Sequence, residues 1–358
     1  MDFSKYGIHF VLPKGAPQST INAINLSTIS PCQVLPGAVK SLFIPSIGSR
    51  VEFGKLLGKG SYASVFLSTV ITPTSRFEAA TKTFHLNSRS DINKANSLVN
   101  TIVREILINI AIFETFRIEK KIQCVPEIFY VCIADDELYI IQELLDGDLS
   151  DYISHTPSLT VDSYIDIIAQ FSACVKNLQD LLGFGHRDIK INNIGFKRIA
   201  TKTSSFLFPS DHINFTTSNP GIRLYLIDFG FSCLTFNGTQ LSADAIFNPR
   251  AICYREGRDI AQFLYSLYIH GIHKFPRLIS FLDYCLNVRI NGIVCSIPKT
   301  CEAFGMRTWI DVYAFLNRTD IDYTRTQPTN MLRMIQQYVT SQMLPTGTSD
   351  ILGSAQTP

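Results

Sequence analysis

Short apolar runs of strand length dominate the first part of the chain after residue 50. These runs cover residues 51–57, 62–70, 77–84, 127–133 and 137–142. One stretch among them, residues 95–116, has the apolar spacing of a helix. The pattern predicts an antiparallel sheet that carries one helix.

The apolar spacing becomes mainly helical after Gly147. Residues 161–182 and 258–272 have helix-length periodicity, whereas residues 191–197 and 222–227 have the pattern of a short strand pair. Between those strands, residues 200–220 are rich in Ser, Thr and Asn, which predicts a long hairpin loop. The predicted fold class is therefore α+β, with a small sheet first and helices after it.

Both ends of the chain lack sustained periodicity. Residues 1–48 mix prolines with Ser, Thr, Asn and Gly, and we expect this extension to pack through Phe10, Leu42 and Phe43. Residues 344–358 are small and polar, which predicts a flexible tail.

Composition narrows the possible partners. The 358 residues are 46% hydrophobic and 17% charged, enough to bury the core of one large domain or two closely packed ones. A formal charge of +2 provides no broad field for nucleic acid or an anionic membrane, so we expect neither partner. The chain lacks a signal-peptide pattern and a run of 18 uncharged apolar residues.

The number and spacing of the cysteines indicate the compartment of the protein. The nine cysteines are an odd number, and none forms a C-x2-C pair. We expect reduced thiols in an intracellular protein, cytoplasmic or nuclear. The oligomeric state is left open.

A glycine-rich segment lies between the first two apolar runs. It reads Gly58-Lys59-Gly60-Ser61-Tyr62-Ala63-Ser64-Val65. Its two glycines would let backbone N–H groups approach a polyphosphate without obstruction by side chains. Glycines also form ordinary hairpins, so the motif is weak by itself.

A lysine and a glutamate follow at positions where they could form a pair. Lys82 comes late in an apolar run and could reach phosphate oxygens if a carboxylate held it in place. Glu105 lies on the predicted helix, whose apolar face would press it against the sheet. Without other motifs, both would be ordinary solvated charges.

The most specific motif follows residues 161–182. It reads His186-Arg187-Asp188-Ile189-Lys190-Ile191-Asn192-Asn193. In phosphoryl transfer, Asp188 would position the acceptor hydroxyl, Lys190 would offset charge on the γ-phosphoryl group, and Asn193 would bind a metal ion. The alternative is a polar turn in which Asp188 caps a loop.

A second acidic residue ends the later strand of the pair. Residues 224–227 form an apolar run that leads into Asp228-Phe229-Gly230. The Asp228 carboxylate could bind Mg²⁺ that bridges phosphates. An Asp-x-Gly exit is also a common turn, so its position after Asn193 matters more than its composition.

These five elements, in this order, resemble the eukaryotic-type protein kinase family, from about residue 51 to about residue 269 and more weakly to about 339. The resemblance implies a bilobal fold. It would comprise an extension (1–48), an N-lobe of antiparallel sheet with one helix (49–145), a mainly helical C-lobe with an insertion near 200–220 (146–343), and a tail (344–358).

The resemblance also implies roles for single residues. Residues 58–65 become the loop that covers the phosphates, Lys82 and Glu105 become the ion pair that positions them, and Asp188 becomes the catalytic base. Asn193 and Asp228 become the metal ligands. Val65 and Ala80 would contact one face of adenine.

The segment that would connect the lobes resembles the hinge of the family. Gln142 would be the gatekeeper, backbone groups of Glu143 and Leu145 would face adenine, and Asp148 would lie near the ribose. The spacing is one residue shorter than usual.

Further resemblances concern the acceptor and its regulation. Lys190, two residues after the catalytic Asp, is typical of serine/threonine kinases. Arg187 resembles the arginine that binds an anion on the activation segment, where Thr235, Thr239 and Ser242 are candidate phosphorylation sites.

The chain departs from the family pattern at three points. Ala63 replaces the third glycine of the loop, and Gly195 stands where an apolar side chain usually lies beneath adenine. No Ala-Pro-Glu follows Asp228, and the nearest counterpart is Asn248-Pro249-Arg250. Similar abbreviations occur among kinases of large DNA viruses, which would place the protein in a host cell or a virion.

The resulting expectation is a protein serine/threonine kinase that transfers the γ-phosphoryl group of ATP with Mg²⁺, or alternatively Mn²⁺, to protein hydroxyls. Two alternatives stay open. A kinase-fold scaffold would explain the missing Ala-Pro-Glu. A small-molecule kinase would explain a reduced peptide platform.

Overall fold

The computed structural model describes residues 1–37, 39–60, 63–87, 91–242, 255–270, 275–286, 288–290, 293–295, 305, 308–316 and 321–343. By its contacts the chain divides into two compact units. Unit 1 comprises Met1–Tyr152, Leu178–Lys197 and Leu224–Arg255. Unit 2 comprises Ile153–Asn177, Arg198–Arg223 and Glu256–Pro358.

A seven-stranded sheet, within the described residues, is the largest element of unit 1. Its strand order is β1-β2-β3-β4-β5-β7-β6, and every neighbouring pair is antiparallel. The strands are β1 (Gln33–Leu35), β2 (Ser41–Ile44), β3 (Ser49–Lys59), β4 (Ala63–Ile71), β5 (Arg76–His85), β6 (Ile128–Ala134) and β7 (Glu137–Glu143). The five strands predicted from the apolar runs are confirmed as β3 to β7.

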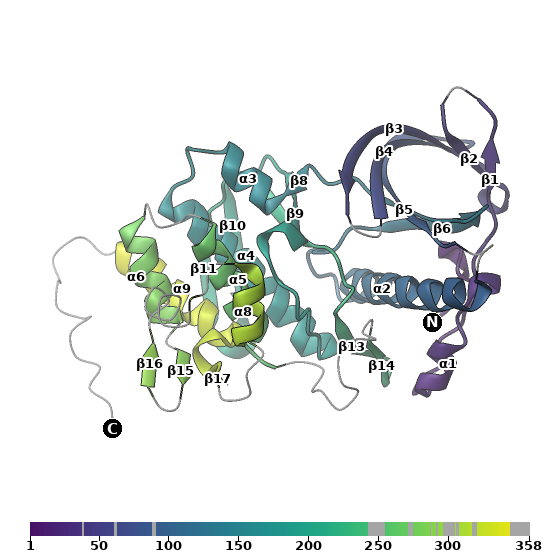
Figure 1. The fold of residues 1–358 in the computed structure, drawn as a ribbon. Helices are drawn as coiled ribbons and strands as arrows, with labels where there is room; N and C mark the ends of the chain where they lie inside the picture. The colour runs from purple at the N-terminus through teal and green to yellow at the C-terminus, as the bar shows by residue number, and fades with distance from the viewer. Residues whose placement is uncertain are drawn as a thin grey trace. The chain divides into compact units, whose positions relative to one another are not determined.

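The predicted helix is confirmed as α2 (Ile92–Ile118), which lies beside the curled sheet (Figure 1). Asp91 caps its first turn, because the Oδ1 atom accepts hydrogen bonds from the N–H groups of Asn93 (3.0 Å) and Lys94 (3.2 Å). Val99, Val103 and Ile106 are buried on its apolar face. Burial of this face fixes the direction in which Glu105 points.

The N-terminal extension (residues 1–48) is built into unit 1. It forms η1 (Ser4–Tyr6), α1 (Gln18–Asn22), η2 (Leu26–Thr28), η3 (Pro45–Ile47) and the strands β1 and β2. Leu42 is fully buried in the sheet core, as predicted, whereas Phe10 and Phe43 are half-buried. Phe10 stacks on the buried ring of Phe3 at 6.2 Å.

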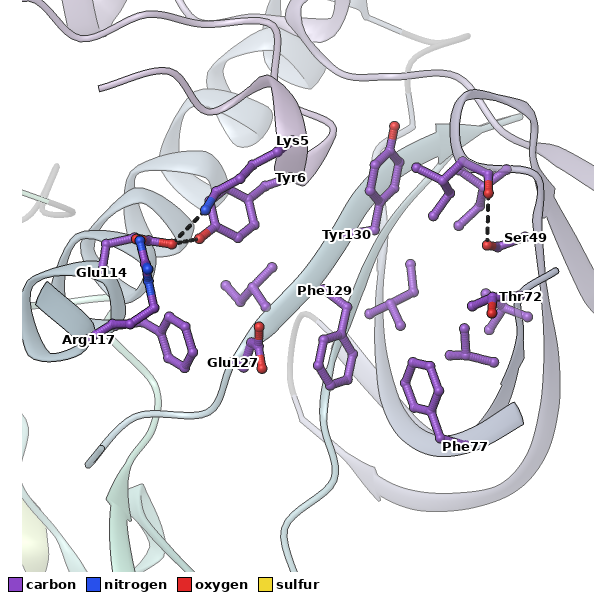
Figure 2. A pocket seen from close by; sticks show the side chains of 17 residues that line it. Lys5, Tyr6, Ser49, Thr72, Phe77, Glu114, Arg117, Glu127, Phe129 and Tyr130 are labelled. Atoms are coloured by element: carbon purple, nitrogen blue, oxygen red, sulfur yellow. Dashed lines mark hydrogen bonds and ion pairs between the residues drawn. The ribbon is translucent and has the colours of Figure 1, made fainter. Parts of the chain in front are cut away.

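One contact of this extension reaches the far end of α2. The Glu114 carboxylate accepts hydrogen bonds from Lys5 Nζ (2.7 Å), Tyr6 OH (2.5 Å) and Arg117 (Figure 2). Burial would raise the pKa of Glu114, but these hydrogen bonds outweigh it and lower the pKa to about 2.

The lowered pKa predicts acid sensitivity. Because the carboxylate binds its partners only when ionised, its stabilising contribution is complete above pH 4.5 and disappears as the pH falls toward 2. We expect the melting temperature of the wild type to fall more between pH 5 and pH 3 than that of Glu114→Gln. Parallel melting curves for the two proteins across this range would contradict the assignment.

The remaining elements that lie wholly or mostly in unit 1 carry the motif residues. They are β8 (Gly147–Asp148), η4 (Ile191–Asn193), β9 (Ile194–Arg198), β12 (Ile222–Leu226), β13 (Cys233–Phe236) and β14 (Thr239–Ser242). The predicted strand pair is confirmed, because β12 and β9 are neighbours in a three-stranded sheet with β8. β13 and β14 form an antiparallel hairpin after Asp228.

Unit 2 is mainly helical, as predicted for this part of the chain. Its helices include most of α4 (Val161–Leu182) and α3 (Leu149–His155) in part, with α5 (Arg258–Ile269), α6 (Pro276–Cys285), α8 (Trp309–Leu316), η7 (Thr324–Thr326) and α9 (Pro328–Met343). The short strands β15 (Val288–Ile290), β16 (Ile293–Cys295) and β17 (Ile321–Asp322) form a small sheet. Phe171 and Phe263 stack at 4.2 Å and join α4 to α5.

The segment 200–220 is an ordered hairpin rather than the predicted loop. β10 (Thr203–Phe208) pairs with β11 (Ile213–Ser218), and η5 (Pro209–Asp211) connects them. The buried Asp166 on α4 accepts hydrogen bonds from Thr217 and Gln170, and Lys176 forms an ion pair with Asp211 at 3.0 Å. The composition of residues 200–220, rich in Ser and Thr, predicted a loop. It could not show that the hairpin would find buried polar partners on α4.

Two further expectations can be compared with the structure. Cys32, Cys124, Cys132, Cys174 and Cys285 are free thiols, whereas Cys233 is disulfide-bonded, so the expectation of reduced cysteines is wrong for Cys233. Within the described ranges, no helix combines the length and the apolar character needed to cross a bilayer. The tail 344–358 lies outside the described residues.

Candidate active site

The glycine-rich segment joins β3 to β4. β3 ends at Lys59, and the Gly60 N–H donates to the Ala63 carbonyl at 2.8 Å. Among the described residues, a Cβ atom on Gly58 would meet nothing within 4 Å, and one on Gly60 would meet the Ala63 oxygen at 3.7 Å. Packing against the described residues therefore does not require these glycines. Ser61 and Tyr62 lie outside the described residues.

Lys82 and Glu105 form the predicted ion pair. Lys82 on β5 places its Nζ atom 3.2 Å from Oε1 of Glu105 on α2, and the two side chains are 22% and 19% exposed. Burial would lower the pKa of Lys82, but the carboxylates of Glu105 and Asp228 raise it above its usual value. Lys82 is therefore a fixed cation with two carboxylates beside it.

The motif at residues 186–193 brings its three polar residues together. Lys190 Nζ lies 3.2 Å from Asp188 Oδ2. The amide nitrogen of Asn193 donates to the Asp188 carbonyl at 2.9 Å and to Oδ2 at 3.0 Å. Asp188 and Asn193 are buried, so this network holds the carboxylate in one orientation.

Backbone hydrogen bonds connect Asp228 to this network. The Ile227 N–H donates to the Asn193 carbonyl at 3.1 Å, and the Leu226 N–H donates to the Cys124 carbonyl at 2.7 Å. His186 Nε2 lies 3.2 Å from the Ile227 oxygen. These bonds fix the spacing between Asn193 and Asp228.

Two residues of the site have left-handed backbone conformations. φ is +69° at Arg187 and +65° at Asp228, values that side chains other than glycine seldom adopt. Next to Asp228, the buried Phe229 packs against the rings of His186 (5.5 Å) and Phe184 (6.2 Å). This aromatic packing stabilises the strained turn that directs Asp228.

A cavity of about 250 Å³ in unit 1 brings the predicted residues of several motifs together. Eight of them line it: Val65, Ala80, Lys82, Glu105, Gln142, Glu143, Leu145 and Asp228. The predicted residues that are not on its wall are Gly58, Lys59, Gly60, Ala63, Asp148, Asp188, Lys190 and Asn193. The cavity thus contains the lysine and the residues predicted to contact adenine, while Asp188, Lys190 and Asn193 lie outside its lining.

Several lining residues were missed by sequence reasoning. Leu57, Ile227 and Asn109 also contribute to the wall. Leu57 and Ile227 directly precede Gly58 and Asp228, so their apolar character beside the motifs was a usable signal. Asn109 gave no signal, although its side-chain oxygen is buried and has no hydrogen-bond partner among the described residues.

Two residues of the predicted hinge segment, Glu143 and Asp148, already have hydrogen-bond partners within the protein. The Glu143 N–H already donates to the Glu127 carbonyl at 2.8 Å, and its carboxylate forms an ion pair with Lys197. Asp148 Oδ1 accepts from the Asp151 N–H at 2.9 Å in the first turn of α3. A contact between Asp148 and a ribose stays a prediction.

Leu145 occupies the space that Gly195 leaves open. A Cβ atom on Gly195 would lie 2.4 Å from Leu145 Cδ1, which is too close for both groups to remain in place. The Leu145 side chain therefore fills the space that a side chain at position 195 would need. The departure at Gly195 is compensated within the same cavity.

A larger cavity of about 540 Å³ lies elsewhere in unit 1. Its wall includes Lys5, Tyr6, Glu114, Glu127 and Phe129 (Figure 2). Burial, together with Glu143 and Glu114, raises the pKa of Glu127. None of the predicted catalytic residues lines this cavity, so size alone does not identify the active site.

The candidate phosphorylation sites differ in accessibility. Thr235 on β13 is exposed, Ser242 on β14 is half-buried, and Thr239 is buried. Thr235 is thus the most accessible of the three to a modifying enzyme. Asn248-Pro249-Arg250 lies outside the described residues.

Comparison with known proteins agrees with this geometry. A family model of the protein kinase domain matches residues 51–248, which include every residue of the site. The chain therefore belongs to the protein kinase family. No curated protein matches it significantly.

Proposed function

We propose that the protein is an ATP-dependent serine/threonine protein kinase that uses Mg²⁺. The observation that carries this proposal is the convergence within unit 1 of the Lys82–Glu105 ion pair and the Asp188–Lys190–Asn193 network. The backbone bond between Ile227 and Asn193 ties Asp228 to that network. Membership of the kinase family supports the reaction class.

Each charged group has a role in transfer. The acceptor hydroxyl oxygen attacks the γ-phosphorus, the bond to the β–γ bridging oxygen breaks, and ADP leaves. Asp188 orients the hydroxyl and accepts its proton. Lys190, 3.2 Å from Asp188, offsets charge that develops on the transferred group. Lys82, held by Glu105, binds phosphate oxygens farther from the reacting bond.

The available oxygen atoms fit a magnesium ion. Because Asn193 uses its amide nitrogen to bind Asp188, its Oδ1 atom stays available as a ligand. The bond from the Ile227 N–H to the Asn193 carbonyl holds the residue next to Asp228 at Asn193. The described residues contain no cluster of three or more His, Cys, Asp or Glu that could form an all-protein metal site. Mg²⁺ suits such a site, because it commonly takes one or two protein ligands with phosphate oxygens and supplies charge neutralisation.

Gly195→Ala tests where the base binds. The new Cβ would displace the Leu145 side chain in the proposed adenine site. We expect this overpacking to weaken ATP binding by about 1 kcal/mol, which corresponds to an approximately fivefold increase in the KM for ATP. Gly195→Ala/Leu145→Val lacks the colliding Cδ1 atom and should return the KM toward the wild-type value. An unchanged KM in Gly195→Ala would place the base elsewhere.

Acceptor specificity can be measured with three peptide sets that differ only in whether the acceptor is Ser, Thr or Tyr. We expect phosphate on Ser and Thr peptides, located by mass spectrometry, because Lys190 is typical of that class. Transfer to Tyr alone would refute the assigned specificity. Phosphorylated small molecules without phosphopeptides would favour a small-molecule kinase, and nucleotide binding without transfer would favour a scaffold.

A further inference from the structure

A stripe of polar residues follows one side of α2. Asn96, Asn100 and Arg104 are spaced four residues apart, so they lie one above another on the helix. Asparagine is a poor residue for a helix interior, because its side chain competes for backbone hydrogen bonds. The stripe therefore needs an explanation other than helix formation.

Each residue of this stripe binds the N-terminal extension. Asn96 Oδ1 accepts from the Leu26 N–H at 3.2 Å. Asn100 Nδ2 donates to the carbonyl oxygens of Ile21 (2.9 Å) and Ile24 (3.0 Å). Arg104 Nη2 donates to Asn22 Oδ1 at 2.5 Å. The segment from α1 to η2 is thus attached along two turns of α2.

The same extension holds the other end of α2. Lys5 and Tyr6 bind Glu114, whose side chain is only 7% exposed (Figure 2). Glu105 lies between the two attachment points in the sequence of the helix. Rotation or translation of α2 that withdrew Glu105 from Lys82 would break hydrogen bonds at both points.

The extension also reaches the segment after Asp228. The Gly15 N–H donates to the Asn237 carbonyl at 2.9 Å, at the turn between β13 and β14. This hairpin also packs against α1 and α2. The extension therefore contacts two elements that border the catalytic residues.

We propose that the N-terminal extension is a built-in brace that positions Glu105, with Asn100 and Glu114 as its main positioning residues on α2. This inference rests on the proposed function, because it assigns the brace to the Lys82–Glu105 ion pair of the same site. α2 then needs no separate partner to keep that pair formed. An extension that served only to stabilise the fold would not affect the ion pair selectively.

The decisive variant is Asn100→Asp in the full chain. It is isosteric, but it replaces the donor that binds Ile21 and Ile24 with a carboxylate facing two carbonyl oxygens. We expect amides of residues 99–112 to exchange hydrogen about tenfold faster, because side-chain bonds to the extension no longer restrain the helix. We also expect kcat/KM for ATP to fall about tenfold, while the melting temperature changes little.

Two variants on the same helix provide matched controls. Asn93→Asp introduces the same charge at an exposed position, where we expect wild-type exchange and kinetics. Asn96→Asp keeps the oxygen that accepts from Leu26, so it should behave as a conservative variant. Any general effect of a new carboxylate on α2 would appear in all three proteins.

The outcomes separate the brace from the proposed function. Wild-type exchange in residues 99–112 of Asn100→Asp would overturn the brace, as would faster exchange confined to residues 18–26 with unchanged kinetics. If the wild type transfers no phosphate to any acceptor, the proposed function fails. The exchange rates and the affinity for ATP would still test the brace in that case.

Discussion

Asp188→Asn is expected to reduce kcat about a thousandfold while the KM for ATP stays within about threefold of the wild-type value. The substitution keeps the size of the side chain and one oxygen acceptor for Asn193, but it removes the charge that accepts the hydroxyl proton. Asp188 is not on the wall of the cavity that we propose binds the nucleotide, so binding of the nucleotide should persist. Single-turnover kinetics with a Ser or Thr peptide, together with ATP titration, would measure both quantities.

The matched control for this variant is Asp135→Asn, the same substitution at an exposed turn between β6 and β7. It should leave both constants unchanged. A kcat of Asp188→Asn close to that of the control would remove Asp188 from the role of catalytic base. A large rise in the KM with normal kcat would instead assign it to nucleotide binding.

Asp228→Asn is expected to abolish the dependence of turnover on Mg²⁺ and to lower kcat about a thousandfold. The reason is that metal-assisted charge stabilisation contributes several kcal/mol, and about 1.4 kcal/mol corresponds to a tenfold change in rate. Kinetics over a range of Mg²⁺ concentrations would measure the loss. Mn²⁺ should be compared in the same experiment, because its ligand preference is similar.

Because Asp228 has a left-handed backbone conformation, Asp135→Asn also serves as the stability control for Asp228→Asn. Both residues have positive φ, +65° and +50°, and asparagine accepts this conformation readily. The two variants should therefore have similar melting temperatures, so that the difference in turnover reports the lost charge. Near-normal, Mg²⁺-dependent turnover of Asp228→Asn would contradict its assignment as a metal ligand.

The elements around the site could be predicted because their signals are local. The apolar runs that become β3 to β7 and the helical spacing that becomes α2 each lie within one segment of the chain. The motifs at residues 186–193 and 228–230 are also contiguous. The order of all the motifs gave the resemblance to the kinase family, and that resemblance predicted that Lys82 would pair with Glu105; the two side chains lie 3.2 Å apart.

The features that escaped prediction depend on contacts between distant residues. The extension has no periodicity, yet Asn100 and Lys5 bind partners 79 and 109 residues away in sequence. Leu145 fills the space above Gly195 from a segment 50 residues earlier. Asp166 on α4 binds Thr217 and so helps to order the hairpin of β10 and β11. Such pairings follow from the folded chain and leave no periodic signature in the sequence.

The central claim is tested most directly by transfer of labelled γ-phosphate from ATP. The wild type would be incubated with Mg²⁺ and a mixture of basic and acidic acceptor proteins, with Asp228→Asn as the parallel sample. The proposed function predicts labelled phosphoserine or phosphothreonine in the wild-type reaction only. ATP binding without label in any protein, or equal labelling by Asp228→Asn, would contradict it.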